Sequence, residues 1–146
     1  MKYKVAIGPL STGWHSWTLL LSPETLTAIS YSQRDLWKLA LNEILGFPKD
    51  PYQDFRNKVN DGIEVCIPPN TQRRDYELTS IKSVCAKYRS MRNQIIIEGI
   101  NGELSKYDIS DRSSTNAIFD SLKSFYSTKY RELGKPTTLV GRIWKT

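Results

Sequence analysis

Histidine and cysteine, the side chains on which many nucleophilic and metal-dependent enzymes rely, are almost missing from this chain. It has one histidine, His15, and two cysteines, Cys66 and Cys85. A serine–histidine or cysteine–histidine pair would have to use His15, whose place between Trp14 and Trp17 favours packing or surface hydrogen bonding. Neither C-x-x-C nor H-x-x-x-H spacing occurs, and two cysteines do not make a disulfide framework. We therefore expect no metal site.

Phosphate-cradling glycine loops are absent too, because the glycines form neither a GxGxxG motif nor a P-loop. Two pairs of acids are close in sequence, Asp50 with Asp54 and Asp108 with Asp111, but nothing distinguishes them from surface or capping acids. These absences predict a protein that is not an enzyme and has no cofactor. The alternative is an enzyme with an unfamiliar site, which would need a pocket containing titratable groups with shifted pKa values.

Long apolar runs are also lacking. Residues 1–5 do not have the apolar core of a signal peptide, and no later segment approaches the length of a membrane span. We therefore expect a cytoplasmic protein, free or peripheral at a membrane surface, with no transmembrane segment. In that compartment both thiols stay reduced.

The composition that remains suits one folded domain. A chain of 146 residues is near the usual domain size, and with 39% hydrophobic residues it can bury a core without disulfides. There is no internal repeat and no long linker, so we expect a single domain over residues 1–146. The net charge of +6 is compatible with a polyanionic partner but is modest for this length.

The clearest pattern lies in residues 78–130. It predicts a basic strand over 81–92, a hydrophobic strand over 94–100, a third strand over 103–109 and an amphipathic helix over 111–130. Strands that follow one another so closely pair as an antiparallel sheet, and the helix directly after them is expected to cover it.

Asn101-Gly102 suits a two-residue hairpin turn, because Asn tolerates positive φ and Gly adopts it freely. Such a turn places Ile96 opposite Tyr107. We then expect Ile96, Tyr107 and Ile109 to face the core, since burying the opposite face of the hairpin would bury the ionic side chains of Asp108 and Lys106. A turn of three or four residues is the alternative, and it could change which face is buried.

The predicted helix has a cap, an apolar stripe and a stop. Ser110 or Asp111 can accept hydrogen bonds from the first turn, and Gly134 followed by Pro136 would end the helix. The stripe is expected to cover the sheet, with a partner-binding role as the alternative. Its members recur at three- and four-residue steps: Ile118, Phe119, Leu122, Phe125, Tyr126 and Leu133.

The first half of the chain predicts a second hairpin, in which Trp17, Leu19 and Leu21 share one strand face and residues 22–24 form the turn. Gly8-Pro9 is expected to end the strand before it. Residues 52–61 form either a short helix or a packed loop. The remaining predictions are strands over 2–7, 14–21, 26–31 and 63–67, a helix over 32–46, a loop over 68–71 and a terminal strand over 137–143.

Basic residues gather around the predicted middle strand, in an interval, 78–97, that contains no acid. Lys87 and Arg89 share a face if both lie on a strand, whereas Tyr88 then points the other way, which weakens a stacking platform for single-stranded nucleic acid. The two interpretations are a solvated edge and a patch that binds an anion or a partner. The candidate residues are Arg73, Arg74, Lys82, Lys87, Arg89 and Arg92.

Three segments together resemble a pleckstrin-homology-like (PH-like) domain of the bacterial kind. Residues 17–26 (WTLLLSPETL) are similar to the family's first hairpin, residues 76–84 (YELTSIKSV) to its approach to the middle strands, and residues 94–126 to its last hairpin and helix. The resemblance implies an α+β fold, with an antiparallel sheet or partly open barrel closed by a C-terminal amphipathic helix. Residues 33–60 would be a helical insertion and residues 137–146 an extension.

Such a resemblance implies a small binding or scaffolding domain. The lipid-binding members resemble one another in a basic first-hairpin loop, whereas residues 8–16 here contain no Lys or Arg. The resemblance therefore argues against simply extending the phosphoinositide recognition of those members to this chain. The leading hypothesis is a non-enzymatic module that engages a protein partner through a sheet edge, the inserted helix or the basic strand. The alternative is binding of a polyanion, either nucleic acid or an anionic membrane lipid, through the basic strand.

Overall fold

The structure, a computed structural model, describes residues 3–12, 15–31, 52–67 and 71–134. The predicted helix over 32–46, most of the loop over 68–71 and the terminal strand over 137–143 lie outside them. The elements in chain order are β1 Val5–Thr12, β2 His15–Leu21, β3 Thr25–Tyr31, α2 Tyr52–Asn60, β4 Thr71–Glu77, a 3₁₀ turn Leu78–Ser80, β5 Ile81–Lys87, β6 Gln94–Gly99, β7 Leu104–Ile109, a 3₁₀ turn Arg112–Ser114, α3 Thr115–Phe125 and β8 Tyr130–Leu133.

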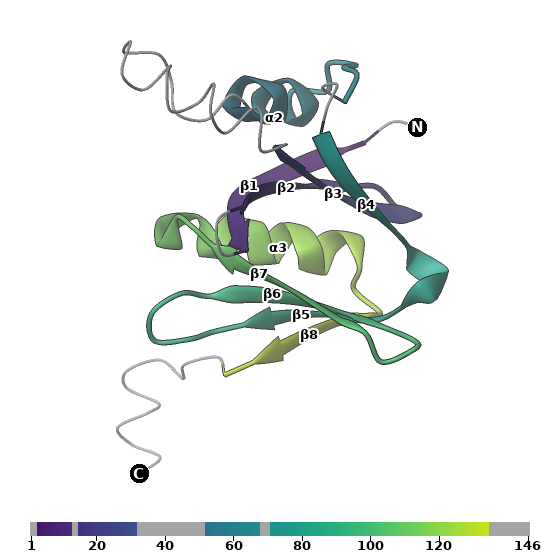
Figure 1. The fold of residues 1–146 in the computed structure, drawn as a ribbon, viewed down its shortest axis with the longest axis vertical. Coiled ribbons are helices and arrows are strands. Elements are labelled where there is room, and N and C mark those ends of the chain that lie inside the picture. Colours follow the sequence, from purple (N-terminus) through teal and green to yellow (C-terminus); the bar gives the residue numbers. More distant parts are fainter. Residues whose placement is uncertain (1–2, 13–14, 32–51, 68–70, 135–146) are drawn as a thin grey trace.

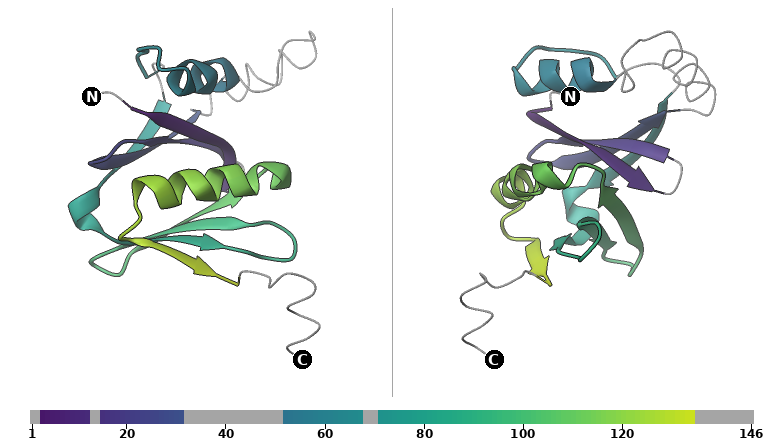
Figure 2. Two further views of the ribbon diagram at one scale, coloured as in Figure 1. Left: turned by 180° about the vertical axis from the view of Figure 1, so that it is seen from behind. Right: turned by 90° about the vertical axis from the view of Figure 1, so that its left-hand side faces the viewer.

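One eight-stranded sheet runs in the order β4-β3-β2-β1-β7-β6-β5-β8. It bends so that β1–β4 and β5–β8 lie as two layers, with α3 alongside the space between them (Figure 1, Figure 2). A sheet-rich α+β fold is thus confirmed. The expectation of a wholly antiparallel sheet is wrong, because β8 pairs with β5 in parallel.

The helix α3 is shorter than predicted. Asp111 caps the turn before it, accepting a hydrogen bond from the Ser113 amide at 3.1 Å, and hydrogen bonds from the Ser113 and Ser114 side chains and the Ser113 amide lower the pKa of Asp111. The helix ends at Phe125, and the chain turns back into β8 rather than continuing to residue 130. Gly134 therefore follows a strand, with φ +65°, and is not a helix stop.

Most of the predicted stripe faces the core as expected. Ile118, Phe119, Leu122 and Tyr126 are buried in the main cluster, and Phe125 is partly buried against it. Leu133 does not belong to the stripe, since it lies on β8 and is 42% exposed. Strands from both layers supply the rest of this cluster, so α3 joins the two layers.

The β6–β7 loop has one residue more than the predicted turn. The Gly99 amide donates to the Glu103 carbonyl at 2.8 Å, which leaves Ile100, Asn101 and Gly102 in the loop. Gly102 has positive φ (+88°), as expected for the glycine of a three-residue hairpin loop.

This extra residue changes which isoleucines face inward. Ile95, not Ile96, lies opposite Tyr107. Ile95 and Ile97 are buried and Ile96 is only half-buried, so the predicted facing of Ile96 is wrong, while Tyr107 and Ile109 are buried as expected. A shift of one residue exchanges the two faces of a strand.

The first hairpin is largely as predicted. Trp17, Leu19 and Leu21 are buried in the main cluster, and the Ser22 amide bonds to the Thr25 carbonyl across the turn. The prediction that Gly8-Pro9 ends the first strand is wrong. β1 continues to Thr12, because a register shift between Ile7 and Leu10 accommodates the interruption.

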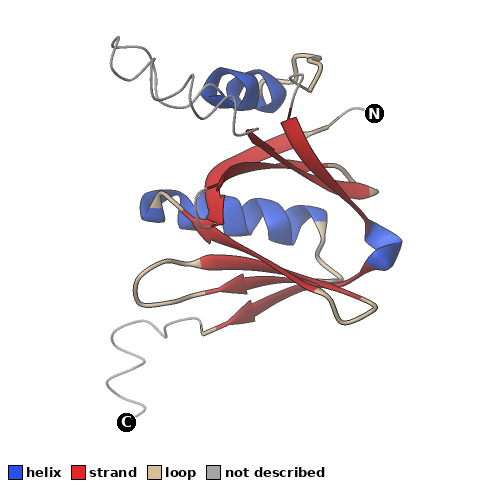
Figure 3. Ribbon diagram, in the orientation of Figure 1, coloured by secondary structure: helices blue, strands red, loops and turns tan. Residues whose placement is uncertain are grey.

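A second apolar cluster lies on the other face of β1–β3, beneath α2 (Figure 1, Figure 3). Tyr52, Phe55 and Val59 of α2 are buried there against Ala6, Leu20 and Ile29, so the helical interpretation of residues 52–61 is confirmed. The strand predicted over 63–67 is wrong, as those residues form no strand. The strand β4, which was not predicted, pairs with β3 instead.

Candidate partner-binding site

The strand β1 has one edge that β7 covers only in part. β1 pairs with β2 along both halves, but with β7 only at Leu10 and Ser11. Nearer its start, the place of a neighbouring strand is taken by a side chain. The Ala6 amide donates to Asn60 Oδ1 at 2.8 Å, and Asn60 Nδ2 donates to the Ala6 carbonyl at 3.1 Å. The edge groups of Ala6 therefore point away from β2.

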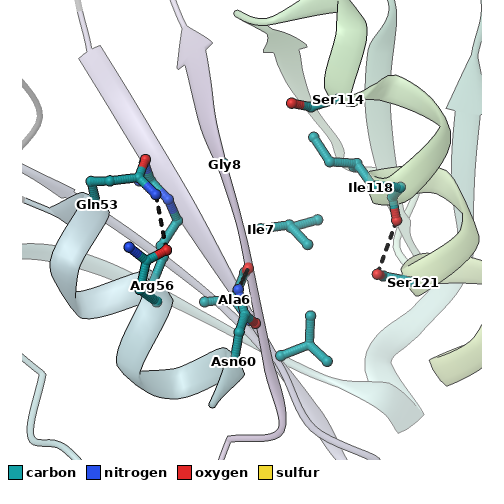
Figure 4. A pocket seen from close by; sticks show the side chains of 12 residues that line it. Ala6, Ile7, Gly8, Gln53, Arg56, Asn60, Ser114, Ile118 and Ser121 are labelled. Atoms are coloured by element: carbon teal, nitrogen blue, oxygen red, sulfur yellow. Dashed lines mark hydrogen bonds between the residues drawn. The ribbon is translucent and has the colours of Figure 1, made fainter.

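A groove of about 410 Å³ runs along this edge, with α2 on one side and α3 on the other (Figure 4). β1 lies between these two helices (Figure 4). Among the described residues that line it, Arg56 is the one charged residue and none is acidic. The lining residues are Val5, Ala6, Ile7, Gly8, Gln53, Arg56, Asn57, Asn60, Ser114, Ala117, Ile118 and Ser121.

Arg56 lies on the α2 side of the groove. The whole residue is 3% exposed to solvent. Its Nη1 donates to Thr18 Oγ1 and its Nη2 to Gln53 Oε1, both at 2.9 Å, and Gln53 Nε2 donates on to Asn57 Oδ1 at 3.0 Å. A Cβ at Gly8 would be 3.4 Å from Nη1, so the guanidinium lies beside the β1 main chain. A chain of polar groups thus follows the α2 side.

A second cleft, of about 630 Å³, lies between β4 and the β6–β7 hairpin. Asp75, Glu77 and Glu103 line it, so its chemistry is acidic. Tyr76 also lines it, and its hydroxyl is 2.8 Å from that of Tyr107. Because Asp75 already accepts hydrogen bonds from Arg73 and Thr27, the cleft holds fewer unengaged charges than its composition indicates.

Three of the six predicted basic residues are engaged by neighbours on the sheet. Arg73 forms an ion pair with Asp75 at 2.9 Å, and Lys82 approaches Glu98 at 3.8 Å. The guanidinium of Arg74 lies over the Trp17 ring, 5.3 Å from its centroid. These three do not join the others in one patch.

The other three predicted residues, Lys87, Arg89 and Arg92, lie where β5 passes into β6. β5 ends at Lys87, so the prediction of a strand continuing to residue 92 is wrong, and Arg89 and Arg92 are exposed on a loop. Arg112 holds that loop in place by donating from Nη1 to the carbonyls of Ser90 at 2.7 Å and Met91 at 3.1 Å.

The tip of this loop exposes an apolar side chain but no aromatic ring. Met91 is 86% exposed. Tyr88, in contrast, packs edge-on against Phe119 with ring centroids 5.1 Å apart. The Tyr88 ring is thus directed into the fold and does not lie among the arginines.

The histidine and the two cysteines, for which the sequence predicts no catalytic role, lie in different parts of the fold. Cys66 is exposed and Cys85 is buried, both are free thiols, and burial raises the pKa of Cys85. His15 begins β2, opposite Thr12. Within the described ranges there is no group of three potential metal ligands, and no helix is long and apolar enough to cross a membrane.

Sequence reasoning missed Arg56 and Asn60, the two polar residues that define the groove. A signal for Arg56 was present, because residues 52, 55, 56 and 59 form one helical stripe and a charged residue within an apolar stripe is unusual. Asn60 had no such signal. Comparison of the chain with protein-family models and with curated proteins finds no match.

Proposed function

We propose that this chain is a non-catalytic binding module of the PH-like kind and that it engages a protein partner through the groove between α2 and α3. The observation that carries the proposal is a pair of hydrogen bonds in the groove. Through them the Asn60 side chain binds the main-chain N–H and carbonyl groups of Ala6. Main-chain donors and acceptors at a strand edge are groups that a partner's backbone can bind. The PH-like assignment is supported by the bent sheet and by the helix packed between its layers.

Binding rather than catalysis is supported by the side chains that line the groove. Among the described lining residues, Arg56 alone has an ionisable side chain, and a guanidinium stays charged and cannot act as a general base. The Ser121 hydroxyl donates to the Ala117 carbonyl within α3, and the Ser114 hydroxyl donates to the Asp111 carboxylate that caps the turn before this helix. Orientation of a bound segment, not proton transfer, is what these groups can provide.

Site-specific photo-crosslinking in the native host tests the module. A benzophenone side chain at Ala117, which is exposed at the groove, is expected to give a discrete protein adduct on irradiation. The matched control carries the same group at Lys106, an exposed position on β7 outside the groove. Equal adducts from both positions, or no adduct from either, would count against a partner-binding groove.

An anionic lipid surface is a second candidate partner, supported by the β5–β6 loop. Arg89 and Arg92 flank the exposed Met91, and Arg112 fixes the loop backbone. Basic residues beside an apolar side chain suit a headgroup surface. The packing of Tyr88 on Phe119 removes the aromatic ring that single-stranded nucleic acid would stack on.

Flotation with vesicles containing phosphatidylserine tests this second candidate. The double substitution Arg89→Gln/Arg92→Gln should weaken partitioning about thirtyfold, since each basic residue near such a surface contributes about 1 kcal/mol. Arg73→Gln is the control, because Asp75 already pairs with that arginine, and it should change little. If the parent chain does not float at low salt, this candidate is excluded. Binding to single-stranded RNA under the same conditions would favour nucleic acid instead.

A further inference from the structure

We propose that the β5–β6 loop and residues 135–146 bind one anionic lipid surface together, with Met91 and Trp144 entering its headgroup region and the basic residues beside them binding its anionic groups. This inference rests on the second candidate partner, the anionic lipid surface, and names the two segments that meet it. Residues 135–146 lie outside the described residues. Their sequence and the position of Gly134, the residue before them, support the proposal.

The β5–β6 loop, residues 88–93, has a fixed backbone. Arg112 Nη1 donates to two main-chain carbonyls at its tip, and Asn93 Oδ1 accepts a hydrogen bond from the Arg89 amide at 3.0 Å. Asn93 is anchored in turn, because its Nδ2 donates to Thr115 Oγ1 at 3.0 Å. These bonds engage the main chain of the loop, so binding at the tip does not first have to order it.

The side chains at the tip of this loop are basic and apolar. Met91 is 86% exposed, and Arg89 and Arg92 on either side of it are exposed too. Within the described part of the chain, neither arginine side chain pairs with an acid. The carboxylate of Asp111 accepts hydrogen bonds from the serines of the turn that it caps. The tip therefore presents two cations around one apolar side chain.

Two arginines alone are too few for stable attachment to a membrane. Attraction to an anionic lipid surface rises with the number of basic residues near it, and segments that bind such surfaces carry clusters of about four to eight. Binding also rises with the apolar area that enters the interface, and a single methionine supplies little of it. A second basic and apolar segment at the same place is therefore required.

The residue from which the segment 135–146 starts lies beside this loop. Lys87 pairs with Leu133, and the Tyr88 amide donates to the Leu133 carbonyl at 2.8 Å. A Cβ on Gly134 would be 2.7 Å from the Tyr88 carbonyl oxygen. The end of β8 and the base of the β5–β6 loop are therefore adjacent (Figure 1).

The sequence of residues 135–146 has the composition that the loop lacks. It contains Lys135, Arg142 and Lys145 and no acid, so the two segments together have five basic residues when the two loop arginines are included. Trp144 stands directly before Lys145, and the amphipathic ring of tryptophan favours the headgroup level of a membrane. The two segments together supply the charge and the apolar area that the loop alone does not.

Flotation of the full chain with vesicles of phosphatidylcholine and phosphatidylserine tests the second segment. Arg142→Gln/Lys145→Gln should weaken partitioning about thirtyfold, since each of the two basic residues contributes about fivefold. The matched control is Lys82→Gln/Lys106→Gln, which removes the same charge from exposed positions of β5 and β7. It should change partitioning less than about threefold, because charges remote from the lipid surface are screened by salt.

A second double substitution separates charge from a structural effect. Arg142→Lys/Lys145→Arg keeps both positive charges and should partition like the parent chain, because the attraction to the surface is electrostatic. Both double variants must retain the circular dichroism spectrum of the parent. A loss in the charge-retaining variant as large as that in the glutamine variant would overturn the proposed role of these residues.

An environment-sensitive fluorophore tests whether both apolar side chains enter the lipid surface. Met91→Cys and Trp144→Cys are labelled with nitrobenzoxadiazole in a chain that carries Cys66→Ser, because Cys66 is exposed whereas Cys85 is buried. Both labels should show a blue shift and brighter emission when the vesicles are added. Ile100→Cys, an exposed apolar position at the other end of β6, is the control and should show neither.

These results separate the inference from the candidate partner on which it rests. If the parent chain floats but Arg142→Gln/Lys145→Gln and the label at residue 144 show no change, the lipid candidate stands and the surface of two segments is wrong. If the parent chain does not float at low salt, both fail. Binding to single-stranded RNA, with no emission change from either label on vesicles, would assign the basic residues to nucleic acid and overturn the inference.

Discussion

Leu122→Ala is expected to lower the free energy of unfolding by about 2–5 kcal/mol, the range for truncating a fully buried leucine. Leu122 lies on α3, is 0% exposed and packs in the main cluster. That cluster also contains Trp17 and Leu19 from one layer of the sheet and Ile97 from the other. A cavity at Leu122 therefore opens in the one cluster that both layers share.

The measurement is chemical denaturation of the parent and of two variants. Lys123→Ala is the matched control, because Lys123 is the next residue on the same helix and is exposed, so the change should stay within about 0.5 kcal/mol. A loss below about 1 kcal/mol for Leu122→Ala would mean that α3 is not a structural part of the core. The interpretation of the two layers as one unit would then be wrong.

The position of this helix could be predicted from sequence because its signals are local. Apolar residues at three- and four-residue steps place Ile118, Phe119, Leu122 and Tyr126 on one face whatever surrounds them. Asp111 as a cap likewise depends only on the next few residues. The residue at which the helix ends depends on distant parts of the chain. The Tyr126 hydroxyl donates to the Ser22 and Thr25 carbonyls, and the chain then turns to pair with β5.

The register of the last hairpin could not be fixed for a related reason. Ile95, Ile96 and Ile97 are apolar in succession, so the run itself does not state which face is buried. The choice depended on whether the loop has two or three residues, and Asn101-Gly102 suits both. In the structure Asn101 Oδ1 accepts a hydrogen bond from the Glu103 amide at 3.0 Å, which favours the longer loop.

The candidate groove was beyond sequence reasoning because its parts are distant in the chain. Ala6 and Asn60 are 54 residues apart, and Ala117 is further still. β1 pairs with β7 only at Leu10 and Ser11, so no described strand pairs with this edge of β1 near Ala6. The basic residues illustrate the opposite error, since Arg73, Lys82 and Arg89 are close in sequence yet have different surroundings in the fold.

Alkaline pH should destabilise the fold through buried tyrosines. Burial raises the pKa of Tyr107 and of Tyr126 above the ordinary value of about 10, and for Tyr107 the hydrogen bond with Tyr76 adds to the effect. A group whose pKa is higher in the folded chain contributes its full stability below the unfolded pKa. That contribution is lost as the pH rises above about 10, at about 1.4 kcal/mol for each pH unit and each group until its folded pKa is reached.

Tyr126→Phe separates this effect from general alkaline unfolding. Near neutral pH the variant should lose about 1 kcal/mol, because the hydroxyl no longer donates to the Ser22 and Thr25 carbonyls. Above pH about 10 its stability should fall less steeply than that of the parent, since one titrating group is gone. The free energy of unfolding measured at several pH values on both sides of 10 checks the prediction. Identical slopes for the parent, Tyr126→Phe and Tyr107→Phe would show that these hydroxyls do not govern the alkaline limit, and a steeper slope in either variant would reverse the sign derived from their burial.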